Sequence, residues 1–312
     1  MSLSLNSVDR VRSFSRAYTR RLGILKAHLL DSPFSLTESR VLYEIAHGPG
    51  ILARNLDELL AIDRGYLSRI LARFQRLRLV RTEPGKTDGR CLHLHLTAKG
   101  HRLFSVLNRR SSAQVRELVG HLPDADQERL AESLDCARLL LTPPEESRGA
   151  DLLREPRPGE LGWVVQRHGA LYAAEYGWDV TFETLVAGIV GNFGKNQGDP
   201  GQRAWIAELE GVPVGSVFLI RESEMVAKLR LLLVEPSARG RGTGHRLVAE
   251  CLRFAREAGY QSVTLWTNSV LTAARRIYEQ AGFRLVKEEC HRSFGHDLVG
   301  QNWSVELAPR PE

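Results

Sequence analysis

The chain has 312 residues, of which 43% are hydrophobic and 26% charged, and its mean hydropathy is -0.24. These values are typical of a globular protein with two domains, and they exclude a disordered chain and a membrane channel. The net charge of +6 is unevenly distributed, because residues 1–150 hold 24 Lys and Arg against 17 Asp and Glu, whereas the remainder is close to neutral. This asymmetry predicts a first half that binds a polyanion.

The cysteines and the N-terminal segment indicate the cellular compartment. The four cysteines stand far apart without a CxxC pair, which argues against a disulfide framework and a zinc site. Arginines interrupt the apolar positions of residues 1–21, and no apolar run reaches membrane-spanning length. We therefore expect a cytoplasmic protein that holds no metal and does not engage a membrane.

Three short helices are predicted in the basic first half. Residues 36–45 and 52–62 carry apolar side chains on one helical face, and Asp63 is placed to cap a third helix. In that third helix the apolar residues of 66–77 repeat at a spacing of three and four. Its opposite face is polar and basic, with Arg64, Ser68, Arg69 and Arg73. Two helices followed by one with a basic outer face are typical of a helix-turn-helix.

A β-hairpin is predicted directly after these helices. Residues 79–82 and the alternating segment 91–97 flank a stretch rich in turn residues that includes Lys86 and Arg90. The hairpin thus has a basic tip and forms the wing of a winged helix.

Residues 36–100 resemble the MarR family of winged-helix transcription regulators. The resemblance rests on the order of three helices and a wing, on the wing tip Asp88-Gly89-Arg90 and on the ending Leu-Thr-Ala-Lys-Gly at 96–100. The resemblance implies a mostly α-helical domain that forms homodimers through helices expected at 8–30 and 99–141. It also implies contacts with operator DNA from Arg64, Ser68, Arg69, Arg73, Lys86 and Arg90. The alternative is that these arginines are the solvated face of a helical dimerisation module.

A domain boundary is predicted where Pro, Gly and Ser interrupt the helical pattern, at 142–149 and 156–159. We assign residues 1–145 to the first domain, 146–160 to a linker and 161–312 to a second domain. The second domain has β-type runs that alternate with helical stretches, which predicts an α/β fold. These runs are 162–167, 204–209, 214–220, 228–234 and 262–267.

A glycine-rich turn follows the strand expected at 228–234. It contains Arg239, Gly240, Arg241, Gly242, Thr243 and Gly244, and a helix is expected at 245–257. Glycines between a strand and a helix N-terminus let backbone amides approach an anion such as a pyrophosphate. The turn lacks the Gly-Lys-Ser/Thr ending of a nucleotide-hydrolysing P-loop. It also lacks the GxGxxG spacing and the downstream acidic residue of a dinucleotide fold. By spacing alone, a tight strand-to-helix connection is an equal alternative.

The pattern Arg239-x-x-Gly242-x-Gly244, together with 265–268 and 273–283, resembles the GNAT superfamily of N-acetyltransferases over residues 162–307. The resemblance implies a GNAT fold and acetyl-CoA as co-substrate, with the turn binding its pyrophosphate. It implies that the backbone of Leu232, Leu233 and Val234 pairs with the pantetheine arm. It also implies that Asn268 and Tyr278 complete the site, with Tyr278 as the proton donor.

The general base is less well defined. The strand at 228–234 offers Lys228 and Arg230 where some members of the superfamily place a glutamate. Glu208 is the first substitute, Glu175 and His291 come next, and a relay through water is equally compatible with the sequence.

We therefore expect a fusion of a MarR-like winged helix with a GNAT-like N-acetyltransferase that transfers acetyl groups to a primary amine, which we expect to be a small molecule. One alternative is a DNA-binding regulator whose second domain only senses an acyl-CoA or an amine. The other is an acetyltransferase that uses its winged helix only for dimerisation.

Overall fold

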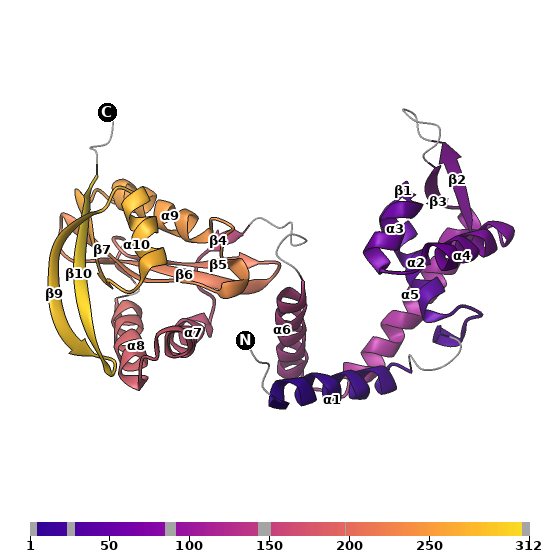
Figure 1. Ribbon diagram of the computed structural model, residues 1–312, viewed down its shortest axis with the longest axis horizontal. Helices are drawn as coiled ribbons and strands as arrows, with labels where there is room; N and C mark the ends of the chain where they lie inside the picture. The colour runs from indigo at the N-terminus through magenta and orange to yellow at the C-terminus, as the bar shows by residue number, and fades with distance from the viewer. Residues whose placement is uncertain (1–4, 24–28, 85–91, 143–150, 197, 308–312) are drawn as a thin grey trace. The chain divides into compact units, whose positions relative to one another are not determined.

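The computed structural model describes residues 5–23, 29–84, 92–142, 151–196 and 198–307. Contacts divide the chain into two units, Met1–Gln127 and Glu128–Glu312 (Figure 1). This division lies before the boundary predicted at 145, because the C-terminal part of one long helix belongs to the second unit, where Leu139 packs into the main core.

The first unit is mostly helical and carries a small antiparallel sheet of strand order β1-β3-β2. Its elements, ending with the helix shared between the units, are α1 (Leu5–Arg21), η1 (Leu29–Asp31), α2 (Leu36–His47), β1 (Ile51–Leu52), α3 (Ala53–Leu60), α4 (Arg64–Arg76), β2 (Val80–Pro84), β3 (Leu92–Leu96), α5 (Ala98–Val119) and α6 (Asp124–Leu141). The predicted three helices and wing strands are therefore confirmed.

Local sequence signals set where these helices begin. Ser35 and Glu38 form a reciprocal capping box at the start of α2, and the Asp63 carboxylate accepts a hydrogen bond from the Tyr66 N–H at the start of α4. The apolar faces of α2 and α4 then meet in a core that includes Leu42 and Phe74, both fully buried.

Gly100 lets α5 lie against the end of the helix-turn-helix. A Cβ at this position would lie 2.1 Å from the Leu79 carbonyl oxygen, a backbone atom that cannot move aside. Thr97 fixes the same junction, because its hydroxyl caps α5 and its N–H donates to the Leu79 oxygen at 2.9 Å.

We expect Gly100→Ala to destabilise the first unit by about 1–3 kcal/mol, the usual cost of forcing extra atoms into a packed region. Denaturant unfolding followed by far-UV circular dichroism measures this. Gly162→Ala is the matched control, because a Cβ there meets no atom within 4 Å. Equal effects of the two substitutions would show that the close approach at Leu79 is not what requires glycine.

The second unit is an α/β domain with a seven-stranded sheet of order β4-β5-β6-β7-β8-β10-β9. Its elements after α6 are β4 (Leu152–Arg154), α7 (Glu160–Tyr176), α8 (Val180–Lys195), β5 (Arg203–Leu209), β6 (Val212–Arg221), β7 (Val226–Val234), η2 (Pro236–Ala238), α9 (Thr243–Glu257), β8 (Ser262–Asn268), α10 (Thr272–Gln280), β9 (Arg284–Ser293) and β10 (His296–Glu306). Helices α7 and α8 cover one face of the sheet, and α9 and α10 cover the other (Figure 1).

Two segments of this unit differ from the sequence prediction. Residues 162–167, predicted as a strand, lie in α7, because the short apolar run is one turn of a helix whose buried side chains Val164, His168 and Leu171 recur every three or four residues. The described part of the predicted linker contains β4, which pairs with β5 and so belongs to the sheet. The other predicted strands, at 204–209, 214–220, 228–234 and 262–267, are confirmed.

Within the residues that the structure describes, no helix is both long and apolar enough to cross a membrane.

Candidate functional site

The adjacent strands β7 and β8 run parallel and then separate. They pair from Val226 with Ser262 up to Leu229 with Leu265, and no pairing between the two strands is recorded beyond this point in the described part of the sheet. The second half of β7 therefore has hydrogen bonds to β6 on one side and a free backbone edge on the side facing β8. This edge includes the backbone of Leu232, Leu233 and Val234, which was predicted to pair with a pantetheine arm.

A β-bulge in β7 lies just where the strands separate. Leu231 has a φ of 51°, a left-handed conformation that is costly for a leucine. On β6 the register shifts between Ser216 and Phe218, whose partners on β7 are Leu233 and Arg230. The Ser216 hydroxyl donates to the Leu231 carbonyl at 2.9 Å, which helps to hold this conformation. The bulge bends β7 away from β8.

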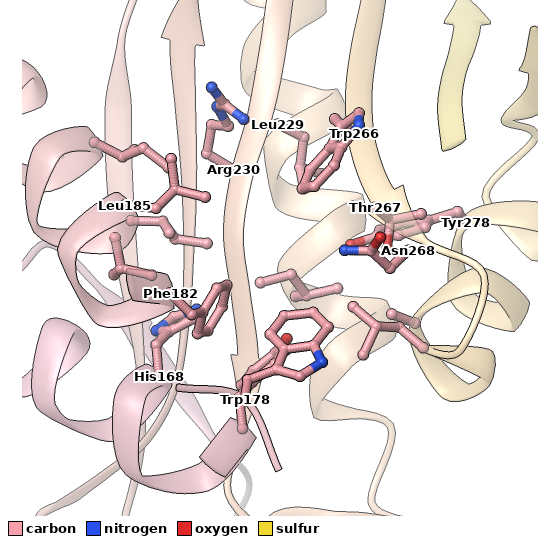
Figure 2. A pocket seen from close by; sticks show the side chains of 17 residues that line it. His168, Trp178, Phe182, Leu185, Leu229, Arg230, Trp266, Thr267, Asn268 and Tyr278 are labelled. Carbon is pink, nitrogen blue, oxygen red and sulfur yellow. The ribbon is translucent and has the colours of Figure 1, made fainter. Parts of the chain in front are cut away.

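A pocket opens at the separated strands, between them and the helices α7, α8 and α10. Its walls are His168, Tyr172, Trp178, Phe182, Leu185, Val186, Ile189, Leu229, Arg230, Leu231, Leu232, Trp266, Thr267, Asn268, Leu271, Ala274 and Tyr278. Figure 2 shows Phe182 approaching from one side and Asn268 from the opposite side, with β7 between them. The structure thus brings together Leu232, Asn268 and Tyr278, three residues predicted for one site.

Tyr278 and Asn268 are buried polar residues on the wall formed by β8 and α10. Burial raises the pKa of the Tyr278 hydroxyl far above its usual range, so the phenol is protonated at neutral pH. The Asn268 carboxamide oxygen lies 2.9 Å from the His291 Nε2 atom, which positions the amide at the end of β8. His291, an alternative general base, is thus engaged by Asn268 and lies outside the pocket lining.

The glycine-rich turn leads from β7 into the N-terminus of α9. Gly240 and Gly242 have φ values of 77° and 82°, and Gly242 is the N-cap of the helix. A Cβ at either glycine would meet no atom within 4 Å, so it is the backbone conformation that favours glycine there. The turn thus ends at the N-terminus of α9, where the helix dipole favours an anion.

The side chains around the turn are already paired. The buried Thr243 hydroxyl donates to the Asp151 carboxylate, so Thr243 can offer an anion only its backbone. The Arg239 guanidinium lies 2.7 Å from the carboxylate of Glu175 on α7. Glu175, an alternative candidate for the general base, is therefore engaged in an ion pair. An anion bound at Arg239 would have to share that arginine with Glu175.

Glu208, the first candidate for the general base, is paired with arginine side chains. It stands on β5, is absent from the pocket lining and accepts a 2.6 Å hydrogen bond from Arg154 Nε, with Arg157 at 3.3 Å. The sequence placed it on a central strand but could not reveal its arginine partners, which come from β4 and the segment after it. These ion pairs hold β4 on β5 and engage the Glu208 carboxylate, and the role of Glu208 as the general base stays a prediction.

His168 is a functional candidate that the sequence analysis missed. It is 2% exposed, its Nδ1 atom lies 2.8 Å from the Val164 carbonyl, and its Nε2 atom is buried without a hydrogen-bond partner among the described residues. Burial lowers its pKa to about 4, so the ring is neutral and Nε2 is a free acceptor in the pocket wall. The spacing of apolar residues in α7 could have indicated that His168 is buried. It could not have indicated that the Nε2 atom has no hydrogen-bond partner.

Burial of His168 predicts a pH-dependent stability. The pKa of His168 in the folded protein lies below its ordinary value of 6.5, so below pH 6.5 the unfolded chain binds a proton that the folded protein does not. The free energy of unfolding is therefore highest above pH 6.5 and falls by about 1.4 kcal/mol per pH unit as the pH decreases toward 4. Denaturant unfolding followed by tryptophan fluorescence reports on the second unit alone, because all five tryptophans lie there. His168→Asn should reduce the dependence of the free energy of unfolding on pH between about 4 and 6.5. An unchanged slope in this variant would show that His168 does not cause the dependence.

The helix α4 presents part of the predicted DNA-binding surface. Arg64, Ser68 and Arg69 are exposed. Arg64 is held by Asp57 at 2.6 Å, and the Arg69 guanidinium lies 5.6 Å from the centre of the Tyr66 ring. Lys86 and Arg90 of the wing tip lie outside the described residues.

Arg73, predicted to contact DNA, makes contacts within the first unit. Its guanidinium pairs with the buried Glu38 carboxylate in the first turn of α2 and donates to the Pro33 carbonyl, which precedes α2, at 3.1 Å. It also lies 5.3 Å from the centre of the Phe34 ring. These contacts hold α4 against the start of α2, and the role of Arg73 as a DNA contact stays a prediction.

Comparisons with known families match both units. Residues 32–90 match the family model described as MarR family, and residues 144–283 match the one described as acetyltransferase (GNAT) family. The N-acetylaspartate synthetase of Xenopus tropicalis is 39% identical over 88 residues, which are 28% of this chain and 32% of that protein. The human N-acetylaspartate synthetase is 36% identical over 86 residues, 27% of this chain and 28% of that protein. The chain thus spans about a third of these relatives.

Among solved structures, the yncA acetyltransferase of Salmonella typhimurium, determined with its cofactor acetyl-CoA, is 16% identical with a TM-score of 0.45 and covers 53% of this chain and 98% of that one. A GNAT superfamily phosphinothricin acetyltransferase from Sinorhizobium meliloti, in complex with AcCoA, is 17% identical with a TM-score of 0.44 and covers 51% and 89%.

Proposed function

We propose that this chain, which joins a MarR-family segment at 32–90 to a GNAT-family acetyltransferase segment at 144–283, is both a transcription regulator and an acetyl-CoA-dependent N-acetyltransferase. Its acceptor is a primary amine of small size, its winged helix binds operator DNA, and it acts as a homodimer. The enzymatic and the DNA-binding parts of this proposal rest on separate observations and have separate tests.

One observation carries the enzymatic part: the free edge of β7 beyond the Leu231 bulge faces a pocket that also holds Tyr278. A pantetheine arm is an extended chain with amides, so it can add to a free strand edge by backbone hydrogen bonds. The edge leads at its C-terminal end into the turn at 239–244, where α9 offers amides to a pyrophosphate. The fit of strand edge, turn and pocket supports acetyl-CoA as the co-substrate.

The pocket residues can then perform the steps of acetyl transfer. Acetyl-CoA supplies the acetyl group as an activated thioester. The neutral amine nitrogen attacks the thioester carbonyl carbon, a C–N bond forms, the C–S bond breaks, and the Tyr278 phenol gives a proton to the departing thiolate sulfur. The proton that the nitrogen loses as the amide forms returns to the Tyr278 phenolate. No carboxylate occurs among the residues that line the pocket, so the amine reacts after losing its proton to water.

Release of free thiol from acetyl-CoA, measured with a panel of primary amines, tests the enzymatic part. We expect amine-dependent release that fails with tertiary amines, because these have no proton to lose on acetylation. If the protein binds acetyl-CoA in calorimetry but releases no thiol with any amine, the second unit is a sensor and the enzymatic part is wrong.

An exposed apolar stripe on α1 supports the homodimer. Val8, Val11, Phe14 and Tyr18 recur at a spacing of three and four, and Val11 and Phe14 keep 66% and 53% of their surface exposed. Apolar side chains gathered in this way on a helix are typical of a surface that another protein covers. The helix lies within the N-terminal region through which the sequence analysis expected two copies to associate.

A further inference from the structure

Arg230 carries a charge that the acetyl transfer does not use. Among the residues that line the pocket it is the one side chain with a formal charge at neutral pH, since His168 is held neutral. The side chain is half-buried, and its Nε atom is fully buried without a hydrogen-bond partner in the described part of the chain. A buried guanidinium donor without an acceptor is costly.

Lys228, a neighbouring basic residue, has the carboxylate partner that Arg230 lacks among the described residues. Lys228, two positions earlier on β7, pairs with the Glu222 carboxylate at 2.5 Å, and Glu222 also accepts a 2.5 Å hydrogen bond from Thr264. Glu222 therefore neutralises Lys228 and acts on Arg230 only at longer range. Burial lowers the pKa of Arg230, and the attraction from Glu222 offsets only part of this effect. The positive charge of Arg230 thus lacks a close counterion within the described residues.

The position of Arg230 separates it from the coenzyme's pyrophosphate. The turn at 239–244 follows the C-terminal end of β7, whereas Arg230 precedes the Leu231 bulge. A thioester that lies along Leu232 to Val234 would reach the bulge from the C-terminal end of β7, which is the side opposite Arg230. Arg230 therefore lies on the side from which the acceptor enters.

The rest of the acceptor side is aromatic. Trp178 and Phe182 pack edge to face with ring centroids 4.7 Å apart, and Tyr172 lies 4.6 Å from Phe182. Figure 2 shows the Arg230 guanidinium at one end of the pocket and Trp178 and His168 at the other. A ligand that fits both ends has an anionic group and an apolar body.

We propose that the acceptor is an amino acid with an apolar or aromatic side chain, whose carboxylate is bound by Arg230 and whose side chain packs among Tyr172, Trp178 and Phe182. This proposal rests on the proposed acetyltransferase function and specifies its substrate class. A guanidinium matches a carboxylate through two parallel N–H···O hydrogen bonds, which would supply the acceptor that the buried donor lacks.

Amines that differ only in the carboxylate test the proposal. The pairs are L-phenylalanine with phenethylamine, L-tryptophan with tryptamine, and L-leucine with isopentylamine. Charge-assisted hydrogen bonds in a desolvated pocket predict a kcat/KM about 10- to 100-fold higher for the amino acid in at least one pair. If the decarboxylated amine is used equally well or better in every pair, the proposal is wrong while the acetyltransferase function stands.

Variants of Arg230 test whether this residue causes the preference for the amino acid over the decarboxylated amine. Arg230→Gln should remove this preference by raising the KM for the amino acid about 10- to 100-fold, with little change in the KM for the matched amine or for acetyl-CoA. Arg230→Lys should restore part of it, because the charge returns without the fork geometry. Lys228→Gln, which removes a paired charge on the same strand, should keep the preference. A preference that survives in Arg230→Gln would overturn the assignment.

Binding without turnover distinguishes this proposal from the proposed function. Calorimetry with the same three pairs on the coenzyme A complex of the full chain needs no chemistry. Binding of the amino acid at least tenfold tighter in at least one pair, lost in Arg230→Gln, supports the carboxylate site even if no acetyl transfer occurs. Equal or undetectable binding of both ligands in every pair overturns the proposal, even if other amines are acetylated.

Discussion

Tyr278→Phe is expected to lower kcat for acetyl transfer by about 100-fold or more, because proton transfer by a positioned side chain typically contributes 10²- to 10⁴-fold. The KM for acetyl-CoA should change little, since the phenol acts on the sulfur as it leaves and contributes little to binding the thioester. Free-thiol release under saturating acceptor measures kcat, and its dependence on acetyl-CoA gives the KM.

The structure allows this substitution without loss of packing. Tyr278 is 5% exposed and meets Phe283 edge to face at 5.8 Å, contacts that a phenylalanine retains. The raised pKa of Tyr278 adds a second expectation: the wild-type rate should show no alkaline loss from this group, because the phenol stays protonated over the working range.

Tyr260→Phe is the matched control. Tyr260 is equally buried, but it does not line the pocket and its hydroxyl donates to the Gly201 carbonyl at 2.7 Å. This variant should keep the wild-type kcat. A Tyr278→Phe variant with normal kcat would show that the proton comes from another donor, and an equal loss in both variants would indicate a general effect on the fold.

The second large effect concerns DNA. Arg69→Ala should weaken binding to the duplex upstream of the protein's own gene by about 10- to 100-fold, the range for an arginine that contacts bases from a recognition helix. The slope of log affinity against log salt should also decrease if Arg69 binds a phosphate. Gel shifts at several salt concentrations measure both quantities.

Arg73→Ala is the contrasting variant on the same helix. Because Arg73 ties α4 to Glu38 and Pro33, its loss should lower the unfolding temperature of the first unit and leave Glu38 without its partner. Arg69→Ala should leave the unfolding temperature unchanged, since its side chain is exposed. If Arg69→Ala binds the duplex with normal affinity and salt slope, the exposed face of α4 is not the DNA-binding surface.

The sequence was sufficient where local signals decide the structure. Ser35 and Asp63 mark helix starts by their side-chain acceptors, and the alternation at 91–97 marks a wing strand, so the winged helix could be predicted in order. Strands of the second unit were predicted because their apolar runs are bounded by turns. The run at 162–167 was misassigned, since a short apolar stretch fits a helix turn as well as a strand.

The candidate site could be predicted only where it depends on sequence order. The turn at 239–244, Asn268 and Tyr278 follow one another in a recognisable pattern. The bulge at Leu231 has no local signature, because a leucine in a left-handed conformation is maintained by its neighbours on β6. The partners of Arg73 and Glu208 are 35 and 54 residues away in sequence, so their ion pairs arise from tertiary packing alone.

A crystal structure of the full chain with acetyl-CoA tests the central claim most directly, namely that the separated strands β7 and β8 form the site of acetyl transfer. We expect the pyrophosphate at the backbone amides of 239–244, the pantetheine arm along Leu232, Leu233 and Val234, and the thioester sulfur within hydrogen-bonding reach of the Tyr278 hydroxyl. Acetyl-CoA bound elsewhere, or with its thioester away from Tyr278, would contradict it.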